Sequence, residues 1–199
     1  MDRRGGYTEQ PRKLVLLGNT NVGKTAILLR YVNNEFQPSA VPTVGASFTT
    51  KRLPQTDGSV LKLELWATAG QERYRSLIPM YYKDAAAAIV VYDVSSAESF
   101  LGAQEWVQEV RIHANPDVLI ILVGNKTDLS RAVRPADVSA FVQENSLSHY
   151  EMSAKTGAGV LETFADLSSQ LYNVLPTPRS SLSLKDHRQQ TNSGSACCW

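Results

Sequence analysis

Hydrophobic residues recur along this chain with two different spacings. In some segments they are continuous or alternate with polar residues, which is typical of strands, and in others they return every three or four residues, which is typical of helices. The pattern predicts strands at residues 12–18, 46–54, 59–66, 86–92, 118–124 and 148–152. It predicts helices at residues 24–33, 97–113, 135–145 and 158–173.

The order of these elements indicates the fold class. Strands alternate with helices, which favours an α/β fold in which helices cover both faces of a mostly parallel sheet. The apolar runs Ala85–Tyr92 and Val118–Val123 are too short to span a bilayer and are typical of strands buried on two faces. Asp57 and Gly58 are expected to form a hairpin turn between two strands, whereas residues 33–48 are expected to begin as a long loop.

The chain is predicted to consist of three parts. Residues 1–11 are expected to be a flexible N-terminal arm, which lacks the apolar segment of a signal peptide and the start needed for myristoylation. Residues 12–174 carry all the predicted elements and suit one domain. Residues 175–199 are rich in Ser, Thr, Gln and Pro and are predicted to be a disordered tail.

Composition and charge narrow the function classes. Hydrophobic residues make up 43% and charged residues 20% of the chain, as in soluble globular proteins. The net charge is +1, so a nucleic-acid partner is not expected. The two cysteines, Cys197 and Cys198, provide no disulfide framework and suit a reducing compartment. They are either idle thiols or a lipidation site, and their occurrence as a pair in the tail favours lipidation.

A phosphate-binding motif stands between the first predicted strand and the first predicted helix. Residues 18–25 read GNTNVGKT and match the pattern G-x-x-x-x-G-K-[ST]. Backbone N–H groups of such a loop can surround a phosphate, the lysine can reach the terminal phosphates, and the threonine hydroxyl can bind Mg²⁺. The residues expected to contact the nucleotide are Asn21, Val22, Gly23, Lys24, Thr25 and Ala26.

Two later motifs predict that the base is guanine. Asp128 follows a buried strand and can accept hydrogen bonds from N1–H and the exocyclic amine of guanine, whereas adenine offers no such pair of donors. Asn125 is expected to brace the neighbouring loops, and Lys126 to lie along the base. The second motif follows the last short strand, where a backbone N–H can reach the guanine O6. Its residues are Ser153, Ala154 and Lys155.

Three segments around these motifs carry a family resemblance. PTVGASF (42–48), QERYRSLIPMYYKDAAAAIVVYD (71–93) and LVGNKTDL (122–129) resemble the Rab family of small Ras-like GTPases, and look closest to its early-endosomal group. The resemblance covers residues 12–173 and implies the P-loop NTPase fold of small GTPases. It also implies a GTP/GDP switch with Mg²⁺ that recruits effectors in vesicle and endosomal transport, at the cytoplasmic face of endomembranes. An exchange factor and a GTPase-activating protein are further implied partners.

The resemblance also assigns roles around the γ-phosphate. Phe36 is expected to pack against the guanine edge, and Thr43 to bind both Mg²⁺ and the γ-phosphate. Gly70 is expected to offer its N–H to the γ-phosphate, and Gln71 to orient the attacking water in GTP hydrolysis. Thr25 and Thr43 are therefore the expected metal ligands from the protein.

Two further sites are implied on the surface and in the tail. Phe48, Trp66 and Tyr81 match the aromatic triad through which Rab proteins contact effectors, although core packing explains these rings equally well. Cys197 and Cys198 are expected to carry two geranylgeranyl groups, added by the Rab escort and prenylation machinery. Two lipid chains attach a protein to a membrane far more firmly than one chain does.

One position departs from the family. Ala67 stands where the family has an aspartate that holds a water on Mg²⁺. The chain is then a GTPase with low intrinsic activity, a catalytically weak Rab-like protein that sequesters effectors or exchange factors, or a GTPase in which the substitution is silent. An ATP-using P-loop enzyme is disfavoured, because Asp128 matches guanine and not adenine.

Overall fold

The computed structural model describes residues 9–38, 42–70 and 76–173. The predicted tail and most of the predicted N-terminal arm lie outside these residues. The described strands are β1 (Glu9–Leu17), β2 (Ala46–Pro54), β3 (Val60–Thr68), β4 (Ala87–Asp93), β5 (Leu119–Asn125) and β6 (Ser148–Glu151). The described helices are α1 (Lys24–Asn33), α2 (Pro79–Tyr82), α3 (Ala97–His113), α4 (Pro135–Glu144) and α5 (Val160–Asn173).

The strands form one six-stranded sheet in the order β2-β3-β1-β4-β5-β6. β2 and β3 are antiparallel, and every other neighbouring pair is parallel. This confirms the α/β fold with a mostly parallel sheet that the sequence predicts. Because the carboxyl ends of parallel strands meet at the same edge, the loops after β1, β5 and β6 gather there.

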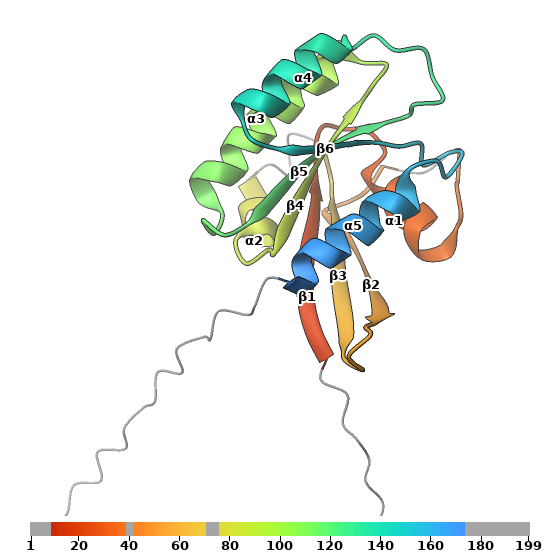
Figure 1. Cartoon of the computed structure of the whole chain (residues 1–199). Coiled ribbons are helices and arrows are strands. Elements are labelled where there is room, and N and C mark those ends of the chain that lie inside the picture. The colour runs from red at the N-terminus through yellow and green to blue at the C-terminus, as the bar shows by residue number, and fades with distance from the viewer. Residues whose placement is uncertain (1–8, 39–41, 71–75, 174–199) are drawn as a thin grey trace, which may run out of the picture.

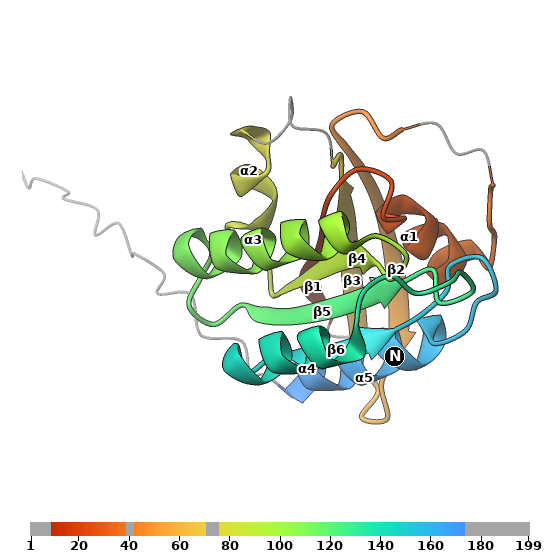
Figure 2. The same ribbon diagram turned by 90° about the horizontal axis from the view of Figure 1, so that it is seen from above.

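Helices cover both faces of the sheet, each group over its own apolar cluster (Figure 1, and from above in Figure 2). α1 and α5 pack on one face through buried residues that include Ile27 and Phe164. α2, α3 and α4 pack on the other face through Tyr82, Val107 and Phe141. β4 lies between the clusters, and all its residues are buried, as its continuous apolar sequence predicts. In the described part of the chain, no helix has both the length and the apolar character needed to cross a bilayer.

The first strand begins earlier than the sequence predicts. β1 starts at Glu9, so the last residues of the predicted arm belong to the sheet. Pro11 argues against a strand at this position in the sequence, because proline has no N–H for the hydrogen-bond ladder and is confined to edge strands and strand starts. It is tolerated here since β1 pairs only with β3 at this level, and its pairing with β4 begins at Leu14.

Two other differences lie on either side of the segment 71–75. β3 continues to Thr68, beyond the end predicted at residue 66, and the Thr68 hydroxyl donates to the carbonyl oxygen of Leu16 at 2.9 Å. The short helix α2 has no counterpart in the predicted elements. Its four residues are too few to show a helical period in the sequence.

Candidate functional site

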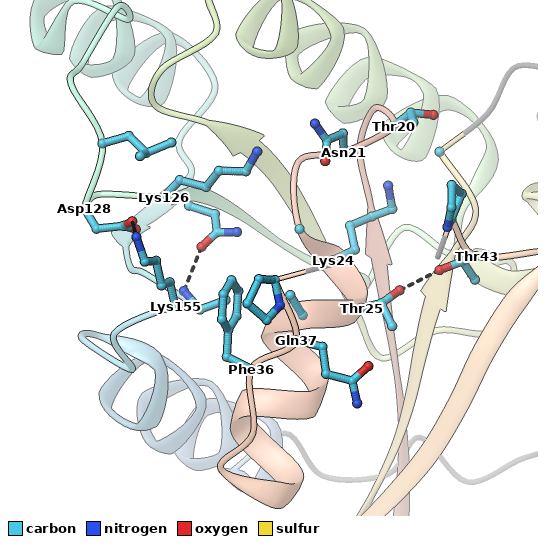
Figure 3. A pocket seen from close by; sticks show the side chains of 18 of the residues that line it. Thr20, Asn21, Lys24, Thr25, Phe36, Gln37, Thr43, Lys126, Asp128 and Lys155 are labelled. Atoms are coloured by element: carbon cyan, nitrogen blue, oxygen red, sulfur yellow. Dashed lines mark hydrogen bonds and ion pairs between the residues drawn. The ribbon is translucent and has the colours of Figure 1, made fainter. Parts of the chain in front are cut away.

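The loops at the carboxyl edge of the sheet surround a pocket of about 540 Å³, a volume typical of ligand sites. Figure 3 shows Lys126, Asp128 and Lys155 on one side of it, and Thr25 and Thr43 on the other. Most of the residues predicted from the motifs line this pocket. They are Asn21, Gly23, Lys24, Thr25, Ala26, Phe36, Thr43, Gly70, Asn125, Lys126, Asp128, Ala154 and Lys155.

The loop after β1 and the start of α1 line the pocket together. Gly23 precedes α1 with a left-handed φ of 97°, and no side chain caps the start of this helix. Gly18 has a φ of 133°, and a Cβ at this position would lie 2.2 Å from the carbonyl oxygen of Val91. The uncapped N–H groups and the positive end of the helix dipole make this part of the pocket suited to an anion.

Lys24 lies within this loop and is only 5% exposed. Its ammonium group donates to the carbonyl oxygens of Gly18 at 2.7 Å and Asn19 at 2.8 Å. Burial lowers the pKa of Lys24 to about 7, because a charged group loses hydration when it leaves water. A neighbouring anion favours the charged form, so this lysine is suited to a phosphate ligand.

The two predicted metal ligands lie side by side. Thr25 Oγ1 and Thr43 Oγ1 are 2.7 Å apart (Figure 3). Adjacent oxygen ligands of octahedral Mg²⁺ lie about 3 Å from each other when the metal–oxygen distance is about 2.1 Å. The two hydroxyls therefore fit neighbouring positions around one Mg²⁺. Within residues 9–38, 42–70 and 76–173, no three His, Cys, Asp or Glu side chains gather as a metal site, so the other ligands would come from phosphate and water.

On the other side of the pocket, Asp128 is held by two neighbours. Ser153 Oγ donates to Asp128 Oδ1 at 2.5 Å, and Lys155 Nζ lies 3.6 Å from Asp128 Oδ2. The hydrogen bond from Ser153 is the main cause that lowers the pKa of Asp128, so this carboxylate is charged at neutral pH. Ser153 is 1% exposed and stands behind Asp128, not on the pocket wall. The sequence motif thus places a fixed acceptor where a guanine edge could bind.

Asn125 joins two of the loops around the pocket. Its Nδ2 donates to the carbonyl oxygen of Val22 at 2.8 Å, and its Oδ1 accepts from the N–H of Ala154 at 3.1 Å. Gly23 leaves room for it, since a Cβ there would lie 2.3 Å from Asn125 Nδ2. These two hydrogen bonds connect the loop after β1 with the loop after β6. The side chain of Val22 belongs to the core, so only its backbone serves the site.

Lys126 lines the pocket next to Asn125. Its ammonium group lies 2.7 Å from Asp93 Oδ2 at the end of β4. Burial acts to raise the pKa of Asp93, but hydrogen bonds from Lys126 and Ser95 outweigh it, and the pKa is lowered. The ion pair holds the Lys126 side chain at the pocket wall, where the sequence predicts that it lies along the base.

The other predicted residues come from segments that approach the loop after β1. Phe36 lines the pocket and packs partly against the core cluster of α1 and α5. Gly70 lies so close to this loop that a Cβ on it would be 2.5 Å from the backbone N of Thr20 and from the backbone C of Asn19. Gln71 lies outside the described residues, so its predicted catalytic role stays a prediction.

Gly70→Ala is expected to lower the preference for GTP over GDP by about tenfold, the effect of losing one hydrogen bond to a charged group. The added methyl group must move Gly70 away from the loop, and its N–H is predicted to meet the γ-phosphate that GDP lacks. The measurement is the ratio of the two dissociation constants. Gly58→Ala is the control, because it adds the same methyl group in the turn between β2 and β3, where a Cβ would have no neighbour within 4 Å. An unchanged ratio in Gly70→Ala would contradict the assigned contact.

Ala67, the position that departs from the family, is 0% exposed. It belongs to the core cluster of α1 and α5, and it pairs across the sheet with Leu16 of β1 and Ser47 of β2. Thr68, the next residue of β3, lines the pocket, whereas Ala67 is not among the lining residues. The side chain at position 67 therefore supplies no oxygen to the site.

Several residues that line the pocket are not predicted from the sequence motifs. Most of them contribute small or apolar wall groups, a role that residue type alone does not signal. They are Thr20, Gln37, Pro38, Pro42, Thr68 and Leu129.

A support from α3 is also absent from the sequence prediction. Trp106 Nε1 donates to Asn19 Oδ1 at 3.2 Å, and so ties α3 to the loop after β1. The Asn19 side chain lies against Gly102, where a Cβ would be 2.2 Å from Asn19 Nδ2. Glycine is unfavourable inside a helix, so Gly102 was the available signal of a close contact.

Phe48, Trp66 and Tyr81 form a continuous aromatic row. The ring centroids of Phe48 and Trp66 are 4.5 Å apart, and those of Trp66 and Tyr81 are 5.5 Å apart. Phe48 is half exposed, while Trp66 and Tyr81 pack partly against the cluster under α2, α3 and α4. Core packing and a surface for partners are therefore compatible for this row.

The chain is similar to known proteins over most of its length. The model of the Ras family matches residues 13–173. Ras-related protein RABF2b of Arabidopsis thaliana is 43% identical over 189 residues, which cover 94% of each chain. Ras-related protein Rab5A of Oryza sativa subsp. japonica is 41% identical over 191 residues, again 94% of each chain. GTP-binding protein ypt5 of Schizosaccharomyces pombe is 45% identical over 163 residues, which cover 80% of this chain and 77% of the relative.

These matches agree with the motifs and with the sheet order, and they confirm the resemblance found in the sequence. They also extend over both sides of the pocket, from the phosphate-binding motif to the loop after β6. The chain therefore belongs to the Ras family of small GTPases, and within it to the Rab5-like group.

Proposed function

We propose that this protein binds GTP and GDP in the pocket together with Mg²⁺, hydrolyses GTP slowly, and acts as a switch in endosomal trafficking. The observation that carries the proposal is one pocket with a fixed carboxylate, Asp128, on one side and a buried lysine, Lys24, beside an uncapped helix start on the other. Relatives named as Rab5 proteins and as GTP-binding proteins support it.

The base is selected by Asp128. Its two oxygens accept from N1–H and the exocyclic amine of guanine, while Ser153 holds one of the oxygens in place. Adenine has no matching pair of donors and would leave a charged acceptor without partners, which is costly in a partly desolvated site. Phe36 and Lys126 supply the walls on the two sides of the base.

The phosphates bind to the loop after β1. On binding, Lys24 exchanges its bonds to the carbonyl oxygens of Gly18 and Asn19 for phosphate oxygens. Thr25 and Thr43 would hold Mg²⁺, and the metal would neutralise the charge that develops on the phosphates during hydrolysis. Gln71 orients the water that attacks the γ-phosphate.

The residues proposed to contact the γ-phosphate, Thr43 and Gly70, lie close in sequence to the strands that carry the aromatic row. Thr43 stands shortly before β2, which carries Phe48, and Gly70 stands shortly after β3, which carries Trp66. Binding of Thr43 and Gly70 to the γ-phosphate therefore fixes both ends of the segments that present these rings. Effectors, exchange factor and GTPase-activating protein would distinguish the two nucleotide states on this surface, at the cytoplasmic face of endosomal membranes.

A second function rests on Ala67. Because the side chain at this position supplies no oxygen to the site, the protein has one fewer polar group to hold the hydration shell of Mg²⁺. Loss of such a group typically lowers metal affinity or activity by about 10–100-fold. A protein weakened in this way would bind exchange factors or effectors without efficient turnover.

The test of the main proposal is the nucleotide that the purified chain carries and prefers. GDP or GTP is expected to be released on denaturation, and binding of guanine nucleotides should exceed that of adenine nucleotides by at least about a hundredfold. Turnover of GTP with and without Mg²⁺ then separates a slow GTPase from a protein that only binds. Equal retention of ATP and GTP would overturn the assignment.

The paired cysteines, which lie outside the described residues, are proposed to carry two geranylgeranyl groups. Replacing Cys197 and Cys198 by serine should move the protein from membranes to the cytosol and leave nucleotide binding unchanged. Each single replacement should weaken attachment, because one lipid chain gives only marginal, reversible binding. Cell fractionation with a nucleotide-binding assay measures both effects, and a double variant that stays on membranes would show that the anchor lies elsewhere.

A further inference from the structure

The guanidinium group of Arg30, in the last turn of α1, makes four hydrogen bonds that no motif predicts. Its Nε donates to the carbonyl oxygen of Ala154 at 2.9 Å, and its Nη2 to that of Lys155 at 2.8 Å. Its Nη1 donates to Asn34 twice, to the backbone oxygen at 2.9 Å and to Oδ1 at 3.0 Å. All three nitrogens of the guanidinium group are thus bonded, a geometry that only the rigid fork of arginine provides.

One group of these bonds fixes the loop after β6. Both backbone groups of Ala154 are hydrogen-bonded, since its N–H donates to Asn125 Oδ1 and its carbonyl oxygen accepts from Arg30. Ser153, the preceding residue, holds the Asp128 carboxylate at 2.5 Å. A shift of this loop would therefore be transmitted directly to the group that selects the base.

The other bonds fix the end of α1, from which the segment with Phe36 begins. Asn34 caps the end of α1 in the left-handed conformation, with a φ of 58°. Phe36, two residues later, lines the pocket. Arg30 therefore fastens the start of the Phe36 segment and the loop after β6 to the same helix turn.

We propose that Arg30 is a positioning residue for guanine recognition. Because one rigid group is bonded to both segments, it sets the position of Phe36 relative to the loop after β6 and the orientation of the Asp128 carboxylate. The inference rests on the proposed binding of guanine nucleotides. The competing explanation is that Arg30 only stabilises α1, since a positive charge in the last turn is favourable to the helix dipole.

Arg30→Lys separates the two explanations, because lysine keeps the charge but cannot make the forked contacts. In this variant we expect GDP release to be about tenfold faster, and the preference for GDP over inosine diphosphate to fall about tenfold. Inosine diphosphate lacks the exocyclic amine that Asp128 is proposed to bind, so this ratio reports the aim of Asp128. Arg30→Met is expected to show the same changes with a lower melting temperature.

Arg12→Met is the matched control. Arg12 also donates its Nε to a carbonyl oxygen near a helix end, that of Leu171 in α5 at 3.3 Å, but it does not line the pocket. The Arg12→Met substitution should lower the melting temperature without changing the preference for GDP over inosine diphosphate. All release rates are measured on the full chain, at a temperature where circular dichroism shows every variant to be folded.

The outcomes separate the inference from the proposed function. If wild type and Arg12→Met fail to bind GDP, the proposed function is wrong and the inference is lost with it. If they bind GDP and Arg30→Lys matches wild type in both release rate and nucleotide ratio, Arg30 serves only the helix. A changed melting temperature with an unchanged ratio in both Arg30 variants would lead to the same conclusion.

Discussion

Ala67→Asp is expected to slow GDP release by about 10–100-fold in millimolar Mg²⁺ and to raise intrinsic GTP hydrolysis in parallel. The site now has two hydroxyls for the metal, Thr25 Oγ1 and Thr43 Oγ1, and the fully buried methyl group of Ala67 adds no oxygen. A carboxylate at position 67 would accept a hydrogen bond from a water of the metal. One added contact then strengthens both nucleotide retention and charge neutralisation at the γ-phosphate.

Release of a fluorescent GDP analogue and single-turnover hydrolysis measure the two rates. With Mg²⁺ removed by a chelator, wild type and Ala67→Asp should release GDP at the same fast rate. Ala67→Asn is the matched control, because it has the same size but no charge, and it should recover only a small part of the effect. If Ala67→Asp changes neither rate, the substitution is silent, and the second proposed function loses its basis.

The aspartate should also lower the stability of the nucleotide-free protein by a measurable amount. Position 67 is 0% exposed within an apolar cluster, and a buried carboxylate without a partner is strongly unfavourable. The melting temperature of nucleotide-free Ala67→Asp is therefore expected to lie below that of wild type. Addition of GDP and Mg²⁺ should reverse the order.

Asp128→Asn is expected to lower GTP affinity by at least about a hundredfold and to favour xanthine nucleotides instead. Asparagine replaces one acceptor oxygen with an NH₂ donor, which matches the 2-oxo group of xanthine and opposes the 2-amino group of guanine. The Ser153 hydroxyl can still donate to the remaining oxygen, so the side chain should stay in place. Competition binding with GDP, xanthosine diphosphate and ADP measures the change.

Asp137→Asn is the control for this substitution. Asp137 of α4 forms an exposed ion pair with Arg134, the residue before this helix, and does not line the pocket. It should leave the order of nucleotide preference unchanged. A variant Asp128→Asn that still prefers GDP to xanthosine diphosphate would mean that another group selects the base.

The fold could be predicted wherever local signals decide the structure. α3 has the predicted bounds, since Ser96 caps its start by accepting from the N–H of Ser99 and an apolar stripe runs along it. The early start of β1 could not be predicted, because Glu9 and Pro11 become a strand only by pairing with β3, which is far away in the chain. α2 is too short to carry a period of its own.

The site divides in the same way. Lys24, Thr25 and Asp128 belong to motifs whose residue types are fixed by the chemistry of phosphate, metal and guanine, and all three line the pocket. Arg30 and Trp106 contact the site from the faces of helices. Arg30 donates to a backbone carbonyl oxygen, and Trp106 donates to the Asn19 side chain. Any part of the chain can offer such acceptors, so spacing in the sequence carries no signal for these contacts.

The position of β1 in the sheet has a consequence for synthesis of the protein. β1 is the first described strand in the chain, yet it lies in the middle of the sheet, between β3 and β4. At about 5–20 residues per second, a ribosome needs about 3–10 s to extend the chain from Leu17 to Thr68 and so complete β3. During this time the apolar residues at the end of β1, which are fully buried in the folded protein, have neither neighbour. Unpaired apolar strands associate readily with other chains, so during this interval the nascent protein is open to aggregation and to chaperone binding at β1.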